Sequence, residues 1–586
     1  MSFNKYYHDE LSFLREMGRE FAQAHPEAAH FLAEGGTDPD VERLLEGFAF
    51  LTGRIRQKLD DEFPEVIHAL VTLLMPHYLR PIPPISLIEL QPIKGMVRKP
   101  YRIAKGMEVA SVPVDGTSCR FHTCFDVDLH PFHIDSVSIQ TPVGGKPELQ
   151  IRFALEPGCS VAWPEVGKLR FFLSGDPAEP LYFWLRRHLT KIRITGSPGQ
   201  RSVEDVYLEP SAVQPAGFKD EEAILPYPKS ASAGYRLVQE YFIFPEKFLF
   251  VELSGLDSVK QQFKGNNFGI DFIFSRPLDR SLKVSLENVR LYCTPVVNLV
   301  KTESEPIRVD HERTEYRLLP SGSHPHHYEI YSIDRAAGWV QGTAQEVEYL
   351  PFYSFRFGKA ESGRLKTFYH PRMRNAVSHD GTDIYVSFVD ADQNVVLPPT
   401  QTVVFQLTCT NRVLAEKLRV GDIQVATEKT PAVVRFRNVT RVTAGIRPPL
   451  EGDLYWQLIS HLGLSSVSLS NAAALRDVLE IYNFPALQSR QAGKANQLRL
   501  EGIVDVQRTP EQLLFRGVPV QGTTTRVTLE ESRFSGEGDM ILFASILNEF
   551  LSLQVTINSF SRLIVKGSEK GETFEWPPRI GRMTIV

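Results

Sequence analysis

The N-terminal 84 residues of this chain carry the periodicity of α-helices, whereas most of the remaining sequence carries that of β-strands. Apolar or small residues first recur at spacings of four and three, the repeat of a helix that lies along another helix. These residues are Tyr7, Leu11, Leu14, Gly18 and Phe21. A second run begins at Asp38 and Pro39, which are typical of an N-cap and a first helical position. It comprises Val41, Leu45, Phe48, Thr52, Ile55 and Leu59, with Leu44 and Leu51 widening the stripe.

A third apolar segment opens at Pro64 and ends at Pro76, because proline clashes with the preceding helical turn. Three such segments in succession predict a helical bundle, whose apolar faces have two interpretations. The helices cover one another and the body behind them, or part of the stripe is left for helices of a partner protein. In the second case the predicted interface residues are Leu11, Leu14, Phe21, Leu45, Phe48 and Ile55.

Size and charge restrict the class of protein. The 586 residues exceed what one hydrophobic core usually supports, so about three or four domains are expected. Lys and Arg total 65 against 70 Asp and Glu, a net charge of -5, so nothing in the bulk charge attracts nucleic acid or anionic lipid. Five scattered cysteines form no disulfide framework and suit a reducing compartment. The first residues lack the apolar core of a secretory signal, and we expect a cytoplasmic protein that does not span a membrane.

Composition shifts predict four domains. Prolines at 76, 81, 83, 84 and 92 force extended backbone and end the helical region at residue 84. Short strands with regular turn residues then dominate, as in sandwiches and barrels, and we divide them into domains at 85–233 and 234–447. Within them, 196–234 is rich in turn formers and predicts a long loop or a subdomain linker, and 318–328 predicts another.

The C-terminal part, 448–586, mixes both periodicities. Helices are expected over 454–462, 472–482 and 540–553, and strands over 498–506, 526–529 and 563–565. The predicted fold class is multidomain α+β, with an N-terminal helical bundle segment, central β-rich domains of sandwich or barrel type, and a C-terminal α+β domain.

No motif in the sequence predicts catalytic chemistry or a bound cofactor. Cys119, His122, Cys124, His130 and His133 lie close together, but they lack the spacing of a zinc site. His324, His326 and His327 lie in a turn-rich loop, where solvated imidazoles are the simpler interpretation. A phosphate-binding loop, a nucleophile elbow and a zincin helix are all missing. We therefore predict no catalytic, cofactor-binding or metal-ligating residue, although triads assembled from distant positions leave no local trace.

Aromatic residues concentrate in the run YRLVQEYFIFPEKFLF, 235–250. Their alternation predicts core strands that meet at a bend at Pro245, and a stacking platform for bases or sugars is the alternative.

This run and four other blocks resemble the TssF family, the type VI secretion baseplate subunits also called VasA or ImpG. The other blocks are DPDVERLLEGFAFLTGRIRQKLDDEFP (38–64), LTCTNR (407–412), LISHLGLSSVSL (458–469) and FSGEGDMILFASILNEFLSLQVTINSFSRL (534–563). The blocks occur in the same order as in the family, and the resemblance extends over essentially the whole chain.

The resemblance implies a structural protein without enzymatic activity, similar to the phage T4 baseplate wedge protein gp6. It further implies a cytoplasmic wedge of two TssF copies and one TssG, with six wedges around the VgrG spike. TssK would link the wedge to the membrane complex at the inner membrane, and TssE and the sheath proteins would sit on it. No cofactor is implied.

A second hypothesis comes from another class, a multidomain β-rich hydrolase that acts on polysaccharide. Its support is the abundance of aromatic residues, 37 Phe, 19 Tyr and 5 Trp. Sugar-stacking sites favour Trp and Tyr faces, so this composition points toward core packing instead.

Overall fold

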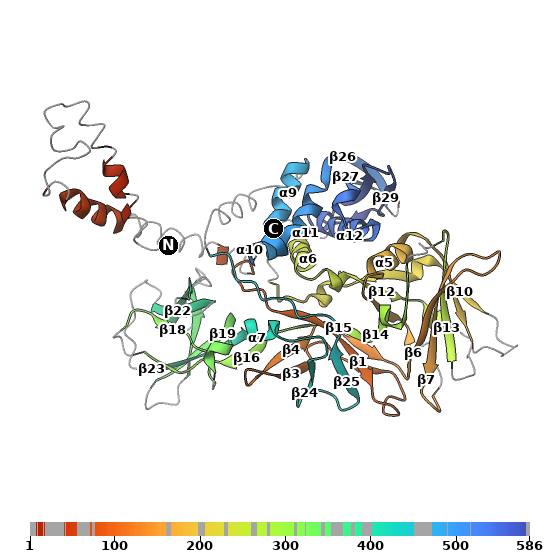
Figure 1. The fold of residues 1–586 in the computed structure, drawn as a ribbon, viewed down its shortest axis with the longest axis horizontal. Coiled ribbons are helices and arrows are strands. Elements are labelled where there is room, and N and C mark those ends of the chain that lie inside the picture. Colours follow the sequence, from red (N-terminus) through yellow and green to blue (C-terminus); the bar gives the residue numbers. More distant parts are fainter. Residues whose placement is uncertain are drawn as a thin grey trace. The chain divides into compact units, whose positions relative to one another are not determined.

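The computed structural model divides into two compact units, Met1–Leu79 with Leu450–Tyr455, and Arg80–Pro449 with Trp456–Val586. Its described residues are 7–8, 10–15, 17, 40, 43–54, 71–72, 77–159, 166–196, 205–227, 233–258, 267–277, 282–309, 313–322, 324–340, 346–352, 367–376, 381–389, 401–450, 471–488, 490–515 and 517–581. In the first unit, residues 7–8, 10–15, 17, 40, 43–54 and 71–72 are helical (Figure 1). Most of the predicted third helix lies outside the described residues, so the bundle stays a prediction.

The second unit is built around a six-stranded antiparallel sheet. Its strands, in spatial order, are β24 (Ile423–Ala426), β3 (Glu108–Val114), β4 (Thr117–Thr123), β15 (Cys293–Val297), β1 (Ile85–Pro92) and β25 (Val434–Asn438). Strand β1, next to the edge strand β25, pairs with segments from distant parts of the chain, since Ile88 lies opposite both Thr294 and Asn438. The alternating side chains of β4 are buried at every second position, as expected for a strand with one face in the core. A small pair, β2 (Tyr101–Ile103) and β5 (Val127–Leu129), accompanies this sheet.

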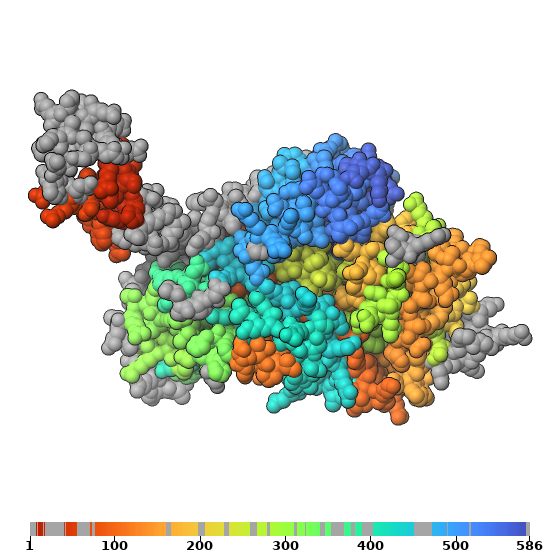
Figure 2. All heavy atoms as spheres, in the orientation of Figure 1, coloured from red at the N-terminus to blue at the C-terminus, as the bar shows by residue number. Residues whose placement is uncertain are grey.

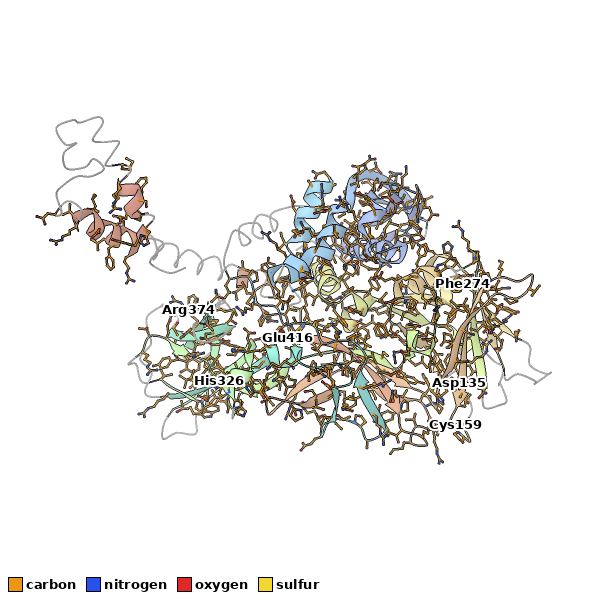
Figure 3. The ribbon with its side chains drawn as sticks, in the orientation of Figure 1. Asp135, Cys159, Phe274, His326, Arg374 and Glu416 are labelled. Carbon is orange, nitrogen blue, oxygen red and sulfur yellow. The ribbon has the colours of Figure 1, made fainter. Side chains whose placement is uncertain are left out.

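An eight-stranded sheet is inserted between β15 and the return of the chain to β24. Its members are β16 (Val300–Glu303), β23 (Gln401–Thr410), β19 (Glu329–Val340), β20 (Glu346–Pro351), β21 (Thr367–Asn375), β22 (Thr382–Val389) and β18 (Tyr316–Arg317), with β17 (Ile307–Val309) also on β23. All pairings are antiparallel except β20 with β21. These strands confirm the prediction that short strands dominate this part of the chain. The short helix α7 (Val413–Glu416) follows the sheet, and Figure 3 shows its Glu416 between Arg374 and His326 on one side and Asp135 on the other.

Two further sheets pack face to face through aromatic side chains. One contains β10 (Val206–Leu208), β9 (Leu189–Thr195), β13 (Asn267–Phe274), β7 (Glu148–Leu155) and β6 (Phe132–Gln140); the other contains β11 (Val213–Ala216), β12 (Phe250–Leu253), β8 (Leu169–Leu173) and β14 (Val289–Leu291). Phe171 of β8 contacts Phe153 of β7 and Phe272 of β13, with ring centroids 6.4 and 6.3 Å apart. Strands β10 and β11 make the prediction of a loop over 196–234 wrong in part.

The aromatic run that predicted two strands forms a helix instead. Helix α6 (Ala233–Ile243) is followed by the 3-10 turn η3 (Pro245–Phe248) and only then by β12. Leu237, Val238 and Tyr241 are buried at helical spacing, whereas the alternation that predicted strands comes from Phe242 and Phe244, which follow them. The prediction that the run is core was right, because Phe244 and Phe248 are also buried.

The C-terminal residues form an α+β arrangement, as predicted. Helices α9 (Ala472–Glu480), α10 (Pro485–Gln488), α11 (Arg490–Glu501) and α12 (Glu537–Leu553) accompany a sheet of β26 (Ile503–Phe515), β27 (Val518–Leu529), β28 (Phe560–Gly567), β29 (Thr573–Glu575) and β30 (Arg579–Ile580). Strand β28 is parallel to β27, and the remaining pairs are antiparallel. The strand predicted over 498–506 begins only at Ile503, because α11 continues to Glu501. The helix predicted over 454–462 lies outside the described residues.

Helix α12 connects this C-terminal part to the middle of the chain. It is apolar nearly all round, and such a helix must be covered on every side. It packs on β28, on α6 and on α5 (Ala178–Arg187). Figure 2 shows the C-terminal residues in blue packed closely along the yellow residues of the middle segment. The fold is thus multidomain α+β, while the domain boundaries at 84, 233 and 447 stay predictions.

Candidate partner interface

The helix over residues 43–54 has two apolar sides with different exposure. Leu45 is half-buried and Ala49 is fully buried, so this side faces inward. Leu44, Phe48 and Leu51 are 66%, 57% and 60% exposed. At about 100° per residue, these three side chains lie within about 60° of one another on the helix surface. We refer to Leu44, Phe48 and Leu51 as the exposed stripe.

Polar groups near the exposed stripe are satisfied locally. The Thr52 hydroxyl donates a hydrogen bond to the Phe48 carbonyl oxygen at 2.8 Å, within the same helix. Arg43 and Asp40 are 3.7 Å apart, but both are largely exposed, so their attraction contributes little stability. A contiguous exposed apolar stripe of this kind is typical of a protein interaction surface.

The first helical segment divides in the same way. Leu11 is 7% exposed and Leu14 is half-buried, whereas Phe13 and Met17 are 57% and 46% exposed. Phe13 and Met17 were not among the predicted interface residues, although their spacing of four placed them on one helix face.

The six predicted interface residues have different surroundings. Phe48 is exposed, Leu14 and Leu45 are half-buried, and Leu11 is buried. Phe21 and Ile55 lie outside the described residues. That these six residues contact a partner protein stays a prediction.

In the larger unit, two asparagines join the six-stranded and eight-stranded sheets. Asn298 follows β15 and Asn411 follows β23, so they mark the two places where the chain crosses between the sheets. Both are buried. The Asn411 backbone N–H donates to Asn298 Oδ1 at 2.6 Å, and Asn298 Nδ2 donates to Asn411 Oδ1 at 2.8 Å. Asn298 Nδ2 also donates to the Arg120 carbonyl oxygen of β4 at 2.8 Å.

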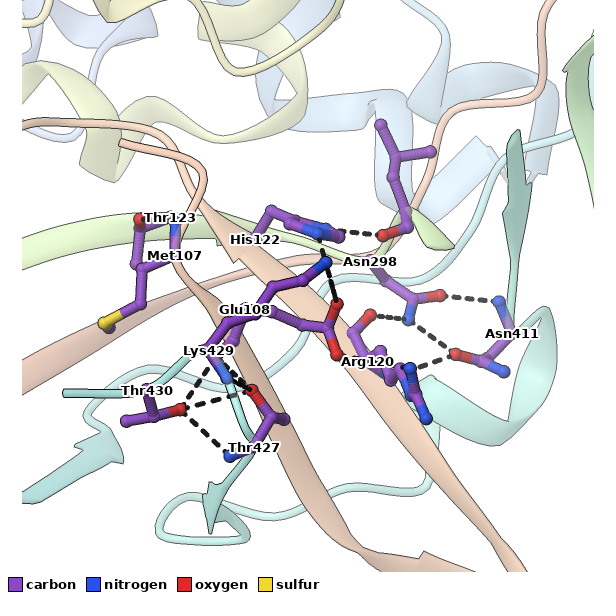
Figure 4. Close-up of polar contacts among 11 residues, drawn as sticks. Met107, Glu108, Arg120, His122, Thr123, Asn298, Asn411, Thr427, Lys429 and Thr430 are labelled. Atoms are coloured by element: carbon purple, nitrogen blue, oxygen red, sulfur yellow. Dashed lines mark hydrogen bonds and ion pairs between the residues drawn. The ribbon is translucent and has the colours of Figure 1, made fainter. Parts of the chain in front are cut away.

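A charged cluster around Glu108 lies beside this asparagine pair (Figure 4). Its carboxylate is 3.2 Å from Arg120 Nη1, 3.4 Å from Lys429 Nζ and 3.7 Å from His122 Nε2. His122 Nδ1 lies 2.7 Å from the Leu299 carbonyl oxygen. Burial lowers the pKa of His122, which keeps the imidazole neutral near pH 7. The geometry is that of a structural ion cluster with each group paired.

The Cys and His residues considered for metal binding have other environments. Burial raises the pKa of the Cys119 and Cys124 thiols to about 11 and about 12, so neither is the thiolate that a metal requires. His324 and His327 stack on each other at 4.9 Å, and His327 Nδ1 lies 2.8 Å from Thr117 Oγ1. Within the described part of the chain, no three His, Cys, Asp or Glu side chains converge to hold a metal ion.

The block FSGEGD has a clear packing role at the start of α12. A Cβ at Gly538 would collide with the Glu179 carbonyl oxygen of α5, so only glycine allows the two helices to approach. The Asp539 carboxylate accepts hydrogen bonds from Arg499 Nε at 2.9 and 3.1 Å and from the Tyr241 hydroxyl at 3.1 Å. This residue therefore ties α12 to α11 and α6.

Among the described residues, no helix has both the length and the apolar character needed to span a membrane.

Comparison with known proteins gives a consistent result. The family model described as type VI secretion system, TssF, matches residues 1–583. The chain belongs to the TssF family. It is 30% identical over 622 aligned residues to the type VI secretion system component TssF1 of Pseudomonas aeruginosa, covering 98% of each chain.

Two solved structures resemble this TssF family member along nearly its whole length. One is a chain of the TssK-TssF-TssG baseplate subcomplex seen by cryo-electron microscopy, with TM-score 0.74, 30% identity, and 92% and 98% of the two chains covered. The other belongs to the baseplate complex from the type VI secretion system, with TM-score 0.62, 28% identity, and 99% and 100% covered. The chain is therefore a TssF baseplate component, and the alternative of a polysaccharide hydrolase has no support from these comparisons.

Proposed function

We propose that this TssF family member is a scaffold without enzymatic activity, and that its N-terminal helices bind a TssG-like subunit through their apolar faces. The observation that carries this proposal is the exposed stripe of Leu44, Phe48 and Leu51. Permanent assemblies bury interfaces of about 2,000 Å² or more with apolar centres. Side chains of this kind supply such a centre.

The proposed interface includes the predicted residues together with the two leucines of the exposed stripe; the full set is Leu11, Leu14, Phe21, Leu44, Leu45, Phe48, Leu51 and Ile55. If about half of one Leu or Phe side chain is buried only on assembly, it contributes on the order of 1 kcal/mol. Several such side chains together decide whether the complex forms. The half-buried Leu14 and Leu45 would connect the exposed stripe to the interior of the helical unit.

The remaining partners are proposed from the family. A related TssF chain belongs to a TssK-TssF-TssG subcomplex, which supports the same three-protein assembly here. We propose two copies of this chain and one TssG in each wedge, with TssK linking the wedge to the membrane complex. TssE, the sheath proteins and the VgrG spike are the further proposed neighbours, and the site of action is the cytoplasmic face of the inner membrane, reached through other subunits.

The experiment replaces Phe48 and Leu51 with aspartate and measures co-purification with the TssG-like protein. Burying two carboxylates in an apolar interface costs several kcal/mol, so the complex should be lost while the isolated chain keeps its circular dichroism spectrum. Phe50→Asp is the matched control. Phe50 is 51% exposed on the same helix, about 120° away from the exposed stripe, and the variant should still co-purify.

Two outcomes contradict the proposed interface. If the double variant still co-purifies, the exposed stripe is not part of the contact. If the double variant is insoluble while Phe50→Asp is not, the side chains belong to the core of this chain instead.

A further inference from the structure

The larger unit contains a cleft of about 1020 Å³ where three of its parts meet. His122 of β4 and Lys105, in the turn before β3, form one wall. The segment 223–227 and α6 form another, and Lys301 and Thr408 come from the eight-stranded sheet. The volume lies at the upper limit of the ~300–1,000 Å³ of small-molecule pockets. A segment of polypeptide fits such a space better than a metabolite does.

The charge of the cleft is positive. The charged residues that line it are the cations Lys105, Arg236, Lys301 and Lys429, against a single carboxylate, Asp220. Arg236 is paired with Asp220 at 2.8 Å, and Lys429 is paired with Glu108.

Two of these cations have no close carboxylate partner in the part of the chain that the structure describes. Lys105 and Lys301 are exposed and make no ion pair with another described residue. Lys105 Nζ donates one hydrogen bond to the Glu221 carbonyl oxygen at 2.8 Å, and the Asp126 carboxylate attracts it without forming a close ion pair. An ammonium group has three donors, so two remain beyond that hydrogen bond. These two ammonium groups are therefore available to carboxylates from outside.

The walls between these charges are apolar and fixed in position. Ile224 and Leu225 lie on one side and Val297 and Leu299 on another, and all four are buried. The backbone N–H groups of Ile224 and Leu225 donate to the Glu240 carboxylate at 2.8 and 3.1 Å. Glu240 is itself paired with the buried Lys247, so this wall is pre-formed.

We propose that this cleft binds a segment of a baseplate partner protein in which acidic side chains flank apolar ones. The carboxylates would pair with Lys105 and Lys301, and the apolar side chains would lie along the wall of Ile224 and Leu225. Charge complementarity selects the segment, and contact with all three parts of the unit would fix the eight-stranded sheet against the rest. The inference rests on the proposed function only in taking the segment from another baseplate subunit.

Nucleic acid fits the cleft poorly. Two exposed lysines, Lys105 and Lys301, are few for binding a phosphate backbone. Base stacking needs aromatic side chains, and among the lining residues Tyr227 is the one Phe, Tyr or Trp. The net charge of the whole chain, -5, also opposes a polyanion.

The test compares lysine reactivity in the free chain and in its complex with the TssG-like and TssK-like proteins. Acetylation of Lys105 and Lys301, followed by mass spectrometry, should fall about tenfold or more on assembly. Lys494 and Lys566 are exposed lysines on the C-terminal part and serve as internal controls, which should not change. Carbodiimide should then join Lys105 or Lys301 to an Asp or Glu of a partner.

A paired variant supplies the second measurement. Lys105→Glu with Lys301→Glu should weaken association with the partner that supplies the segment about tenfold or more, whereas Lys494→Glu with Lys566→Glu should not. A complex in which both cleft amines stay fully reactive overturns the cleft proposal alone. Failure of every complex to form overturns the proposed function. In a parallel incubation with an oligonucleotide, protection of the two amines by the nucleic acid and not by a partner protein overturns the choice of ligand.

Discussion

Asn298 and Asn411 lie 113 residues apart in the sequence and hold each other's polar groups in a buried pair. They stand at the two points where the chain passes between the six-stranded and eight-stranded sheets, so one pair of side chains fixes both crossings. Both polar atoms of the Asn298 side chain are hydrogen-bonded, and such a buried amide specifies one arrangement, because any other leaves these atoms without a partner. This pair explains why the block LTCTNR ends in Asn411 and Arg412, where the chain turns sharply and Arg412 has a φ of 51°.

Replacing Asn298 with alanine should destabilise the attachment of the eight-stranded sheet. The Asn411 N–H and the Arg120 carbonyl oxygen would lose their partner in a buried site, at a cost of about 2–3 kcal/mol. Urea denaturation should show this loss in the free energy of unfolding. Asn411→Ala should cost less in the Asn298→Ala variant than it costs in the unchanged chain. Fully additive effects of the two substitutions would contradict the pairing.

The buried ion pair of Lys247 and Glu240 should be sensitive to the loss of one partner. Both side chains are fully buried, and burial lowers the pKa of Lys247. Lys247→Met leaves the Glu240 carboxylate uncompensated and should cost about 3–5 kcal/mol in thermal unfolding experiments. Adding Glu240→Gln should restore part of this stability, since the amide oxygen still accepts from Ile224 and Leu225. A double variant no more stable than Lys247→Met would contradict this assignment.

Two glycines of the block FSGEGD should respond differently to substitution. Gly538→Ala places a methyl group against the Glu179 carbonyl oxygen and should cost about 1–3 kcal/mol, although alanine is the better helix former. Gly536→Ala meets no atom within 4 Å and should cost no more than about 1 kcal/mol. Equal costs for both variants, read from denaturation midpoints, would remove the packing explanation.

His130 should make the fold sensitive to acid. Burial lowers its pKa from 6.5 to about 4, and its two ring nitrogens have no hydrogen-bond partner among the described residues. Burial makes His130 harder to protonate in the folded state than in the unfolded state. Its contribution to the free energy of unfolding is therefore complete above pH 6.5 and is lost as the pH falls toward 4. The expected slope is about 1.4 kcal/mol per pH unit. His130→Leu should remove that slope from the pH dependence of unfolding, and an unchanged pH dependence would contradict the assignment.

Local patterns predicted some elements well and others poorly. Strands β22 and β23 follow from the alternation of their own residues, and helix α12 follows from its long apolar run. Helix α6 was predicted as a strand because the alternating aromatic residues at and after its end, Phe242 and Phe244, dominated the pattern, while Leu237, Val238 and Tyr241 carry the helical period. The pairing of β1 with β15 and β25 leaves no local trace, since each strand would have the same pattern beside other partners.

The candidate interface was predictable in type but not in detail. The sequence reveals a wide apolar stripe on the second helix, and only tertiary packing decides that Ala49 turns inward while Leu44 and Leu51 stay exposed. The cleft lined by Lys105 and Lys301 could not be predicted, because its walls come from segments far apart in the chain.

The proposal on which the others depend is that this chain acts by burying apolar helix faces against other baseplate subunits. Native mass spectrometry of the chain co-expressed with its TssG-like partner tests this proposal without any substitution. We expect a stable complex of two copies of this chain with one TssG. A chain that remains a free monomer in the presence of that partner would contradict the proposal.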